Sequence, residues 1–267
     1  MNIAFYKFQG TGNDFVMMDN RQGSIELTPA NIRFLTDRKF GIGADGVILL
    51  TDKKGYDFEM TYFNPDGTQT FCGNGGRCAV QFASAIGIKK DKYVFTAADG
   101  DHEATIADTG WVSLKMKDVN GMKKIYDDFL VNTGVPHYVK FVENAKGLDV
   151  VENGKKIRYS PEFITDGVNV NFVQQLDDSE IFVRTYERGV EDETLSCGTG
   201  VTAAALVSAH NDRGFNRVDV ETLGGNLAVE YDKLEDDIFN NIWLCGPAVN
   251  VYRGEVIIPN DLYVSTI

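Results

Sequence analysis

The chain has 267 residues, a formal net charge of −13, 43% hydrophobic residues and 24% charged residues. This composition is typical of a soluble globular protein with one large domain or two of ordinary size, and the negative charge argues against nucleic acid or an anionic membrane as a partner. The sequence has no apolar run near the ~20 residues that cross a bilayer, and it does not start with a basic segment followed by an apolar run. We therefore expect neither a membrane span nor a signal peptide. Four cysteines in a chain of this size indicate reduced thiols in the cytoplasm rather than a disulfide scaffold.

Short strand-like segments dominate the first half of the chain. We expect strands at Ile3–Phe8, Phe15–Asp19, Val47–Thr51, Phe58–Phe63, Lys92–Ala97, Glu103–Ala107 and Trp111–Met116. Thr28 followed by Pro29 predicts the start of a helix, because threonine is a good N-cap and proline suits the first helical position. A second helix is expected after Cys72, in the Ala-rich stretch that includes Cys78–Ala85.

A polar, glycine-containing break at Asp118–Met122 predicts the boundary between two halves. The second half is again rich in strands, expected at Phe129–Asn132, His137–Val142, Asn169–Gln174, Ile181–Glu187, Val218–Thr222, Leu227–Tyr231, Ile242–Cys245 and Val249–Ile258. Its principal helix is expected after Cys197, over Ala203–Ala209. Because no long linker separates the halves, we predict two closely packed, strand-rich domains with a ligand-binding cleft between them.

A cysteine-glycine motif occurs once in each half, as Cys72-Gly73-Asn74-Gly75 and as Cys197-Gly198-Thr199-Gly200. Each copy is expected to place a cysteine at a helix N-terminus, where unpaired N–H groups and the helix dipole favour a thiolate and attract a carboxylate. A thiolate and a thiol on opposite sides of one carbon form a base and acid pair, which indicates a racemase or epimerase that needs no cofactor. The N–H groups expected to hold the substrate carboxylate are those of Gly73, Asn74, Gly198 and Thr199.

The other cysteines and the histidines do not predict a site. Cys78 and Cys245 lack the glycine context and are expected to be buried small hydrophobes. The sequence has no C-x-x-C pair, and its histidines at 102, 137 and 210 are far apart, so no metal site is expected. Nothing in the sequence marks a pyridoxal site.

Two polar segments have both a structural and a functional interpretation, and a third has a structural one. Asn13 lies in a glycine-rich segment without the phosphate-loop pattern, so it is either a turn residue or a cleft residue. Glu187 and Arg188 are suited to hold the ammonium and carboxylate of an amino acid, or they form a surface ion pair. Asn64 begins an Asn-Pro-Asp-Gly segment that is typical of a turn.

Six segments occur in the order seen in the diaminopimelate epimerase family, which the chain resembles over nearly its full length. They are Lys7–Phe15, Phe63–Gly67, Cys72–Cys78, Tyr186–Gly189, Cys197–Gly200 and Gly246–Val249. The resemblance implies an α+β fold of two pseudo-symmetric domains, each a strand-rich layer wrapped around a central helix, with the active site in the cleft between them. With the predicted break, it implies domains of residues 1–118 and 119–248, with a C-terminal strand, 249–267, that returns to the first domain.

The resemblance also implies a cofactor-independent isomerase that converts LL-diaminopimelate to meso-diaminopimelate in lysine and peptidoglycan precursor biosynthesis. Proteins of the family are often homodimers. By position, the implied catalytic pair is Cys72 and Cys197. The implied substrate contacts are Asn13, Asn64, Gly73, Asn74, Asn169, Glu187, Arg188, Gly198 and Thr199, with no metal and no cofactor.

Four departures from the family pattern leave a shifted substrate preference open. Val135 stands where many members have a substrate-contacting asparagine, and Gly46 replaces a glutamine found in some members. Compared with the family pattern, the segment Asn64–Cys72 is shorter by one residue, and the segment Arg188–Cys197 is longer by one residue.

Three alternative functions stay open. A proline racemase-like amino-acid racemase would use the same two-cysteine chemistry, although the segments around Asn13 and Glu187 favour the diaminopimelate reading. A non-enzymatic dithiol redox protein would use Cys72 and Cys197 as a switchable disulfide. A catalytically inactive amino-acid-binding protein would bind its ligand without exchanging the α-proton.

Overall fold

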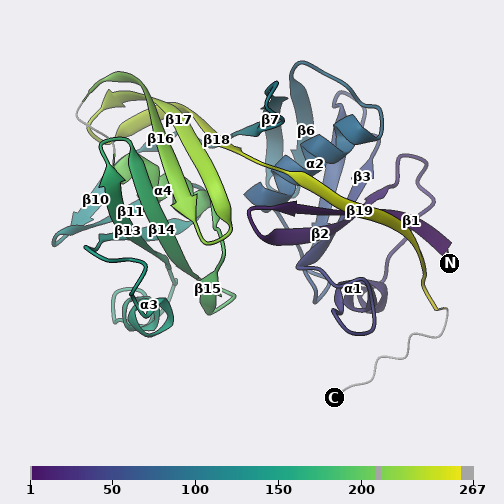
Figure 1. Ribbon diagram of the computed structural model, residues 1–267, viewed down its shortest axis with the longest axis horizontal. Helices are drawn as coiled ribbons and strands as arrows, with labels where there is room; N and C mark the ends of the chain where they lie inside the picture. Colours follow the sequence, from purple (N-terminus) through teal and green to yellow (C-terminus); the bar gives the residue numbers. More distant parts are fainter. Residues whose placement is uncertain (1, 209–211, 260–267) are drawn as a thin grey trace. The chain divides into compact units, whose positions relative to one another are not determined.

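The structure is a computed structural model that describes residues 2–208 and 212–259. The chain divides into two compact units (Figure 1). Unit 1 comprises residues 2–114 and 247–259, and unit 2 comprises residues 115–208 and 212–246. The division falls at the end of strand β8 (Val112–Lys115), just before the break predicted at Asp118–Met122. Of the returning strand predicted at 249–267, residues 260–267 lie outside the described part of the chain, as does residue 209 of the predicted helix.

Unit 1 is built from one sheet and two helices. Its strands are β1 (Asn2–Gly10), β2 (Asn13–Asp19), β3 (Gly46–Thr51), β4 (Phe58–Phe63), β5 (Gln69–Thr70), β6 (Tyr93–Ala97), β7 (Gly100–Ile106), β8 and β19 (Val249–Ile257), and its helices are α1 (Pro29–Thr36) and α2 (Gly73–Ala85). Neighbouring strands follow the order β19-β1-β2-β3-β4-β6-β7-β8. The pairs β2–β3 and β4–β6 are parallel and the others are antiparallel, while β5 pairs antiparallel with β4.

Unit 2 has the same kinds of element. Its strands are β9 (Val119–Asn120), β10 (Met122–Ile125), β11 (Asp128–Asn132), β12 (Pro136–Phe141), β13 (Asn169–Asp177), β14 (Glu180–Glu187), β15 (Asp192–Thr194), β16 (Gly214–Thr222), β17 (Gly225–Glu235) and β18 (Ile238–Gly246), and its helices are α3 (Val150–Arg158) and α4 (Gly198–Val207). The order is β10-β11-β12-β13-β14-β16-β17-β18, with β12–β13 and β14–β16 parallel and the other pairs antiparallel. β15 pairs antiparallel with β14, and β9 with β18.

The two units repeat one connection plan, which confirms the predicted pseudo-symmetric α+β fold. In each order the parallel pairs fall at the same two places, and a helix, α1 or α3, connects the third strand to the fourth. The second helix, α2 or α4, follows a short strand, β5 or β15, that pairs with the fifth strand. Unit 1 matches this plan because the C-terminal strand β19 supplies the first strand of its order.

Each unit encloses its second helix in its own sheet. α2 packs against β1, β2, β3, β4 and β7, and α4 packs against β11 to β14 and β16 to β18. Nearly every residue of α4 is buried, and its Ala203–Ala205 segment allows strands to approach on several sides. The outer face of the unit 1 sheet is covered by α1, whose Ile32 and Leu35 pack in one apolar cluster with residues of β1, β2 and β3.

The predicted helix starts after Thr28, Cys72 and Cys197 are confirmed. Each strand predicted from the sequence overlaps an observed strand, whereas the short strands β5, β9, β10 and β15 were not predicted. Helix α3 was missed, because Gly154 in its interior resembles a helix breaker. A Cβ atom at residue 154 would lie 2.4 Å from Cβ of Tyr186, so this glycine is what allows α3 to lie directly against β14.

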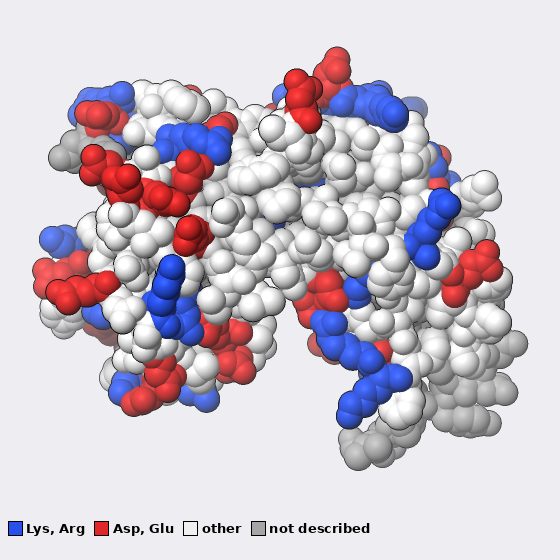
Figure 2. All heavy atoms as spheres, in the orientation of Figure 1, with Lys and Arg blue, Asp and Glu red and all other residues white. Residues whose placement is uncertain are grey.

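The charged side chains do not form a field of one sign on the face that Figure 2 shows. Acidic and basic groups are intermingled on each unit in this view, and ion pairs such as Arg217–Asp219 and Lys92–Glu103 neutralise part of the surface charge. In the ranges 2–208 and 212–259, no helix is both long and apolar enough to span a membrane.

Candidate functional site

Cys72 occupies the N-cap of α2 in unit 1. Its backbone is extended (φ −135°, ψ 124°), its carbonyl accepts the first helical hydrogen bond from the Gly76 N–H (2.8 Å), and its side chain does not cap the helix. The thiol is half-buried and instead donates to Oδ1 of Asn13 at 3.4 Å. A cysteine at this position has its sulfur beside the positive end of a helix.

Two asparagines and two charged residues form a chain of hydrogen bonds around Cys72. Nδ2 of Asn74 donates to Oδ1 of Asn13 at 3.5 Å, and Nδ2 of Asn13 donates to Oδ2 of Asp45 at 2.6 Å. At the other end, Nη2 of the fully buried Arg77 donates to Oδ1 of Asn74 at 3.1 Å. The sequence analysis assigns no role to Asp45 or Arg77. Asp45 lies in the glycine-rich segment Gly41–Gly46, which the sequence predicts to be a tight turn lining the cleft, and no spacing in the sequence relates Arg77 to it.

Asp45 belongs in turn to a cluster of charges on the same side of unit 1. Arg38 pairs with Asp14 at 2.7 Å and with Asp45 at 2.8 Å, and Nζ of Lys7 lies 2.7 Å from Asp14 and also donates to the carbonyl of Gly43. Burial alone would raise the pKa of Asp14, but the hydrogen bonds and positive charges of Arg38 and Lys7 outweigh it and lower that pKa to about 2. Asp14 is therefore held as an anion by these two cations.

Cys197 occupies the N-cap of α4 in the same way. Its backbone is extended (φ −113°, ψ 110°), and its carbonyl accepts from the Val201 N–H at 2.8 Å. Its sulfur lies 3.5 Å from Oγ1 of Thr199, and Oγ1 of Thr133 donates to the Thr199 carbonyl at 3.0 Å. The carboxyl group of Glu187, at the end of β14, is close to this thiol. Burial raises the pKa of Glu187, and the neighbouring side chains of Thr194 and Cys197 partly oppose that shift.

A buried polar network supports the first turn of α4. Oδ1 of Asn171 accepts from Oγ1 of Thr185 at 2.9 Å, and Nδ2 of Asn171 lies 3.1 Å from both the Tyr138 carbonyl and Nδ1 of His137. A Cβ atom at Gly200 would lie 2.3 Å from Asn171 Oδ1. The second glycine of this motif is therefore needed for the close approach of α4 to β13. Burial, and after it the positive charge of Arg188, lowers the pKa of His137 to about 3, so this imidazole is neutral.

Arg188 and Asn169, two of the predicted substrate contacts, are held in place by hydrogen bonds that involve backbone groups. Nη1 of Arg188 donates to the Asp166 carbonyl at 2.7 Å, and its backbone N–H donates to Oδ1 of Asn169 at 2.8 Å. Nδ2 of Asn169 donates to the Pro136 carbonyl at 3.4 Å. Asn169 therefore connects the start of β12 to the end of β14.

The segment after Arg188, which is longer by one residue than in the family pattern, is anchored by Glu191. One carboxylate oxygen of Glu191 accepts from the hydroxyls of Tyr159 (2.8 Å) and Tyr186 (3.0 Å), and the other accepts from the Gly189 N–H at 3.1 Å. Glu191 itself has a left-handed backbone (φ 57°). The turn is thus fixed by one internal hydrogen bond, one to Tyr186 of β14 and one to Tyr159 at the end of α3.

Two other departures from the family pattern, at Gly46 and in the segment that begins at Asn64, lie in unit 1. The side chain of Asn64 donates within its own turn, to Thr68 and to Oγ1 of Thr70. At Gly46, a Cβ atom would lie 2.3 Å from the ring of Tyr62 and 2.6 Å from the Phe63 carbonyl. The buried Tyr62 ring therefore occupies the space that a side chain at residue 46 would need.

The other two cysteines are buried, and the described residues do not meet the requirements of a metal site. Cys78 and Cys245 are buried, and burial raises the pKa of Cys78 to about 12, so this thiol is inert. Among the described residues no cluster of three or more histidine, cysteine, aspartate or glutamate side chains is arranged to hold a metal ion.

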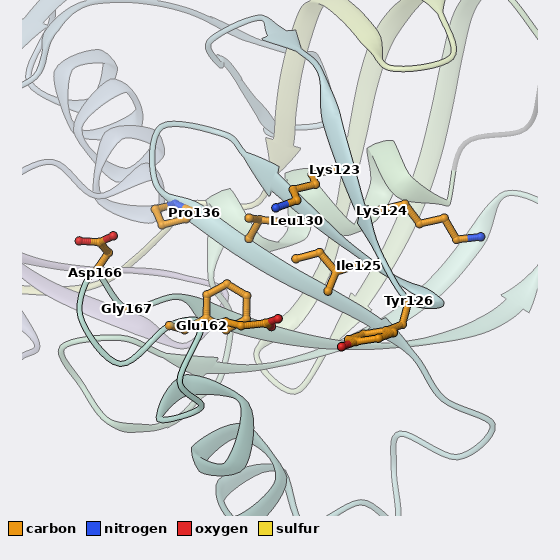
Figure 3. Close-up of a pocket in the computed structure, with 10 residues that line it drawn as sticks. Lys123, Lys124, Ile125, Tyr126, Leu130, Pro136, Glu162, Asp166 and Gly167 are labelled. Atoms are coloured by element: carbon orange, nitrogen blue, oxygen red, sulfur yellow. The ribbon is translucent and has the colours of Figure 1, made fainter.

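Unit 2 also contains a separate open cavity of about 650 Å³. It is lined by Lys123, Lys124, Ile125, Tyr126, Leu130, Pro136, Glu162, Phe163, Asp166 and Gly167. Figure 3 shows Lys123 and Lys124 extending to opposite sides of β10, above the apolar side chains of Ile125 and Leu130. Its lining in the described part of the chain includes none of the predicted site residues.

Solved structures define the class of this fold. The chain aligns with a phenazine biosynthesis protein of the PhzF family from Bacillus anthracis with a TM-score of 0.76 and 16% identity, covering 97% of this chain and 100% of that one. It aligns with a probable proline racemase from Agrobacterium radiobacter with a TM-score of 0.68 and 16% identity, covering 98% and 94%. The duplicated architecture is therefore the one shared by PhzF-type and proline racemase-type proteins.

Sequence relatives define the family within this class. The family model described as Diaminopimelate epimerase matches residues 5–121 and 129–251. The diaminopimelate epimerase of Flavobacterium psychrophilum is 49% identical over 258 residues, covering 94% of this chain and 99% of the relative. That of Chlorobaculum tepidum is 42% identical over 258 residues, covering 92% and 98%. The chain belongs to the diaminopimelate epimerase family and is an isomerase, as the resemblance implied.

Proposed function

We propose that this protein interconverts LL-diaminopimelate and meso-diaminopimelate by inverting one α-carbon, with Cys72 and Cys197 as the two bases and without a cofactor. The observation that carries the proposal is that each unit of a duplicated fold has a cysteine at the N-cap of its enclosed helix. The family membership of the chain supports the substrate.

In the proposed reaction one cysteine acts as a thiolate and removes the α-proton, which becomes its S–H proton. The electron pair of the broken C–H bond stays on the substrate and is delocalised into its carboxylate. The other cysteine, as a thiol, donates its proton to the opposite face of the same carbon and becomes a thiolate. The roles of the two sulfurs are exchanged after one turnover, and the reverse reaction uses them in the reverse order.

The substrate carboxylate is proposed to lie against the N–H groups of Gly73, Asn74, Gly198 and Thr199, which start the two helices. Fixed backbone donors stabilise the charge that develops on a deprotonated α-carbon without having to reorganise.

The remainder of the substrate is proposed to contact Asn13, Asn64, Asn169, Glu187 and Arg188. Glu187 is half-buried beside Cys197, so its carboxylate is suited to hold an ammonium group near this thiol. Val135, in the turn before β12, offers no polar group at the position where many members have asparagine. A role in lysine and peptidoglycan precursor synthesis, a cytoplasmic location and a homodimer belong to the same proposal.

The experiment that tests this function uses reduced protein and LL-diaminopimelate in D2O, with no added cofactor. We expect meso product that carries deuterium at one α-carbon, as followed by chiral chromatography and mass spectrometry. Neither product nor exchange, with the thiols shown to be free, would overturn the proposal. Exchange with proline but not with diaminopimelate would assign the racemase alternative.

A further inference from the structure

The hydrogen bonds around Cys72 run in one direction between two charges of opposite sign. Arg77 donates to Asn74, Asn74 donates to Asn13, and Asn13 donates to Asp45. Cys72 joins this chain at one point, because its sulfur and Nδ2 of Asn74 share the same acceptor, Oδ1 of Asn13.

The charges at the two ends determine how both amide groups are turned. A guanidinium only donates, so Asn74 must present its oxygen to Arg77 and its nitrogen to Asn13. An ionised carboxylate only accepts, so Asn13 must present its nitrogen to Asp45. The oxygen of the Asn13 amide then faces the sulfur of Cys72.

An amide oxygen in this position distinguishes between the two forms of the cysteine. It accepts a hydrogen bond from a thiol, whereas it repels the negative charge of a thiolate. We propose that Asp45 is a positioning residue that holds the Asn13 amide with its oxygen toward Cys72, so that Cys72 rests as the protonated member of the catalytic pair. This proposal rests on the function proposed above, in which Cys72 and Asn13 contact the substrate.

Asp45 is itself held in place by further contacts. Its Oδ2 also accepts from the Asp14 backbone N–H (3.1 Å), and its own N–H donates to Oδ1 of Asp14 (3.0 Å). Arg38 joins the two carboxylates, and Lys7 pairs with Asp14. The charged and titratable groups near the chain in the described part of unit 1 include these four residues and Arg77. The ring of His102 stacks on Phe71, the residue before Cys72, with the two ring centroids 4.0 Å apart.

The corresponding place in unit 2 lacks this arrangement, although the backbone plan is the same. Asp45 comes directly before Gly46, which pairs with Phe15, and Val168 comes directly before Asn169, which pairs with His137. By the same register, Val135 corresponds to Asn13, since each precedes its paired residue by two positions. Two valines at these positions show that the fold does not require the Asn13–Asp45 pair, which points to a role specific to Cys72.

The test measures the reactivity of the Cys72 thiol in the full-length Cys197→Ser protein. The probe is iodoacetamide at neutral pH, and the alkylated peptide is quantified by mass spectrometry. Asp45→Leu removes the acceptor and frees the Asn13 amide to turn, so we expect Cys72 to be alkylated about fivefold faster, the equivalent of one ordinary hydrogen bond. Asp45→Asn keeps an acceptor oxygen of the same shape, so we expect a rate within about twofold of the parent.

Asp19→Asn is the matched control, because Asp19, at the end of β2, is also partly exposed and also pairs with an arginine. It is expected to leave the rate unchanged. Equal rates for Asp45→Leu and Asp45→Asn would overturn the proposal, because a loss of charge or of general stability affects both.

Turnover of the same Asp45 variants, with both cysteines present, separates this proposal from the proposed function. We expect Asp45→Leu to lower kcat/KM for LL-diaminopimelate at least tenfold and Asp45→Asn to restore most of it. An inactive parent protein with the predicted alkylation pattern would reject the proposed function and retain the positioning role. An active parent with equal kcat/KM in both variants would reject the positioning role alone.

Discussion

The side chains that pack beneath the first turn of α2 differ in chemistry from those beneath the first turn of α4, although the two units share one strand order. We call each of these sets of side chains the floor of its helix. Beneath Gly75 of α2 the floor is apolar, and a Cβ atom there would meet Ile48 and Met60 at 3.2 Å and Phe15 at 3.5 Å. Beneath Gly200 of α4 the floor is the hydrogen-bonded network of Asn171, His137 and Thr185.

The strand registers make these two floors comparable residue by residue. Phe15 corresponds to His137, and Ile48 corresponds to Asn171, two positions after the paired residues of β3 and β13. In unit 1 the polar groups instead lie beside the cysteine, in the chain from Arg77 to Asp45. The duplication therefore repeats the backbone that holds each cysteine, while the side chains that surround the two cysteines differ. Two unequal thiols are what an acid and base pair needs.

The largest expected effect tests whether the two cysteines contribute jointly. Cys72→Ser and Cys197→Ser are each expected to lower kcat by about 10³-fold, because each removes one of two proton-transfer groups. Steady-state turnover of LL-diaminopimelate is the measurement, with unchanged circular dichroism as the check on folding.

Cys245→Ala is the control, since Cys245 is a buried residue of β18 outside both cysteine-glycine motifs, and the variant is expected to retain turnover. Near parental kcat in either serine variant would refute the two-base assignment and with it a catalytic role for both units.

The next effect tests a difference at the ends of β4 and β14. By register Phe63 corresponds to Tyr186, so Asn64 corresponds to Glu187 and Pro65 to Arg188. Only unit 2 has charges here, and we expect Arg188→Ala to raise KM for diaminopimelate about tenfold to a hundredfold with a smaller change in kcat, since charged hydrogen bonds contribute about 1.5–3 kcal/mol.

The substrate comparison gives this prediction its control. A shorter amino acid that lacks the distal ammonium and carboxylate is expected to inhibit Arg188→Ala and the parent equally. An equal loss of affinity for both ligands would contradict a distal role for Arg188.

A third prediction sharpens the comparison of the two floors through stability. Gly200→Ala places a methyl group 2.3 Å from a buried amide oxygen, whereas Gly75→Ala places one 3.2 Å from the ends of two side chains that are able to move. We expect Gly200→Ala to lower the free energy of unfolding by about 1–3 kcal/mol and Gly75→Ala to lower it less. Urea unfolding of both variants at pH 7.5 measures the two free energies of unfolding. An equal loss would mean that the two floors accommodate an added methyl group equally well.

The last comparison concerns a pH dependence of stability to which His137 of unit 2 contributes. The pKa of His137 is lowered to about 3 in the folded chain by burial and by Arg188, whereas an unfolded histidine has a pKa of 6.5. Between these values the unfolded state binds one more proton, so stability falls as the pH is lowered from about 6.5 toward 3, by at most about 1.4 kcal/mol per pH unit from this group.

Comparison with a His137→Gln variant isolates this contribution. The difference in unfolding free energy between parent and variant is expected to change with pH below about 6.5 and to be constant above it. A constant difference throughout this range would show that His137 is not held neutral in unit 2.

The sequence predicted the regular elements and the cysteine positions because their signals are local. Thr28-Pro29 indicates a cap within four residues, and alternating or continuous apolar runs indicate strands wherever they occur. Helix α3 escaped prediction because Gly154 has its physical reason in Tyr186, which is far away along the chain. Asp45 and Arg77 escaped for the same reason, since each acts through a partner on another element.

The sequence by itself therefore determined the duplicated cysteine-glycine motif, the helix starts after it and the family of the chain, because these depend on residue types at short spacing. Only the tertiary structure decided which side chains surround each cysteine. The direction of the Asn13 amide, the neutral state of His137 and the space taken by Tyr62 at Gly46 each depend on strands brought together by pairing. Hydrogen bonds and steric exclusion act over a few ångströms in space, whatever the separation along the chain.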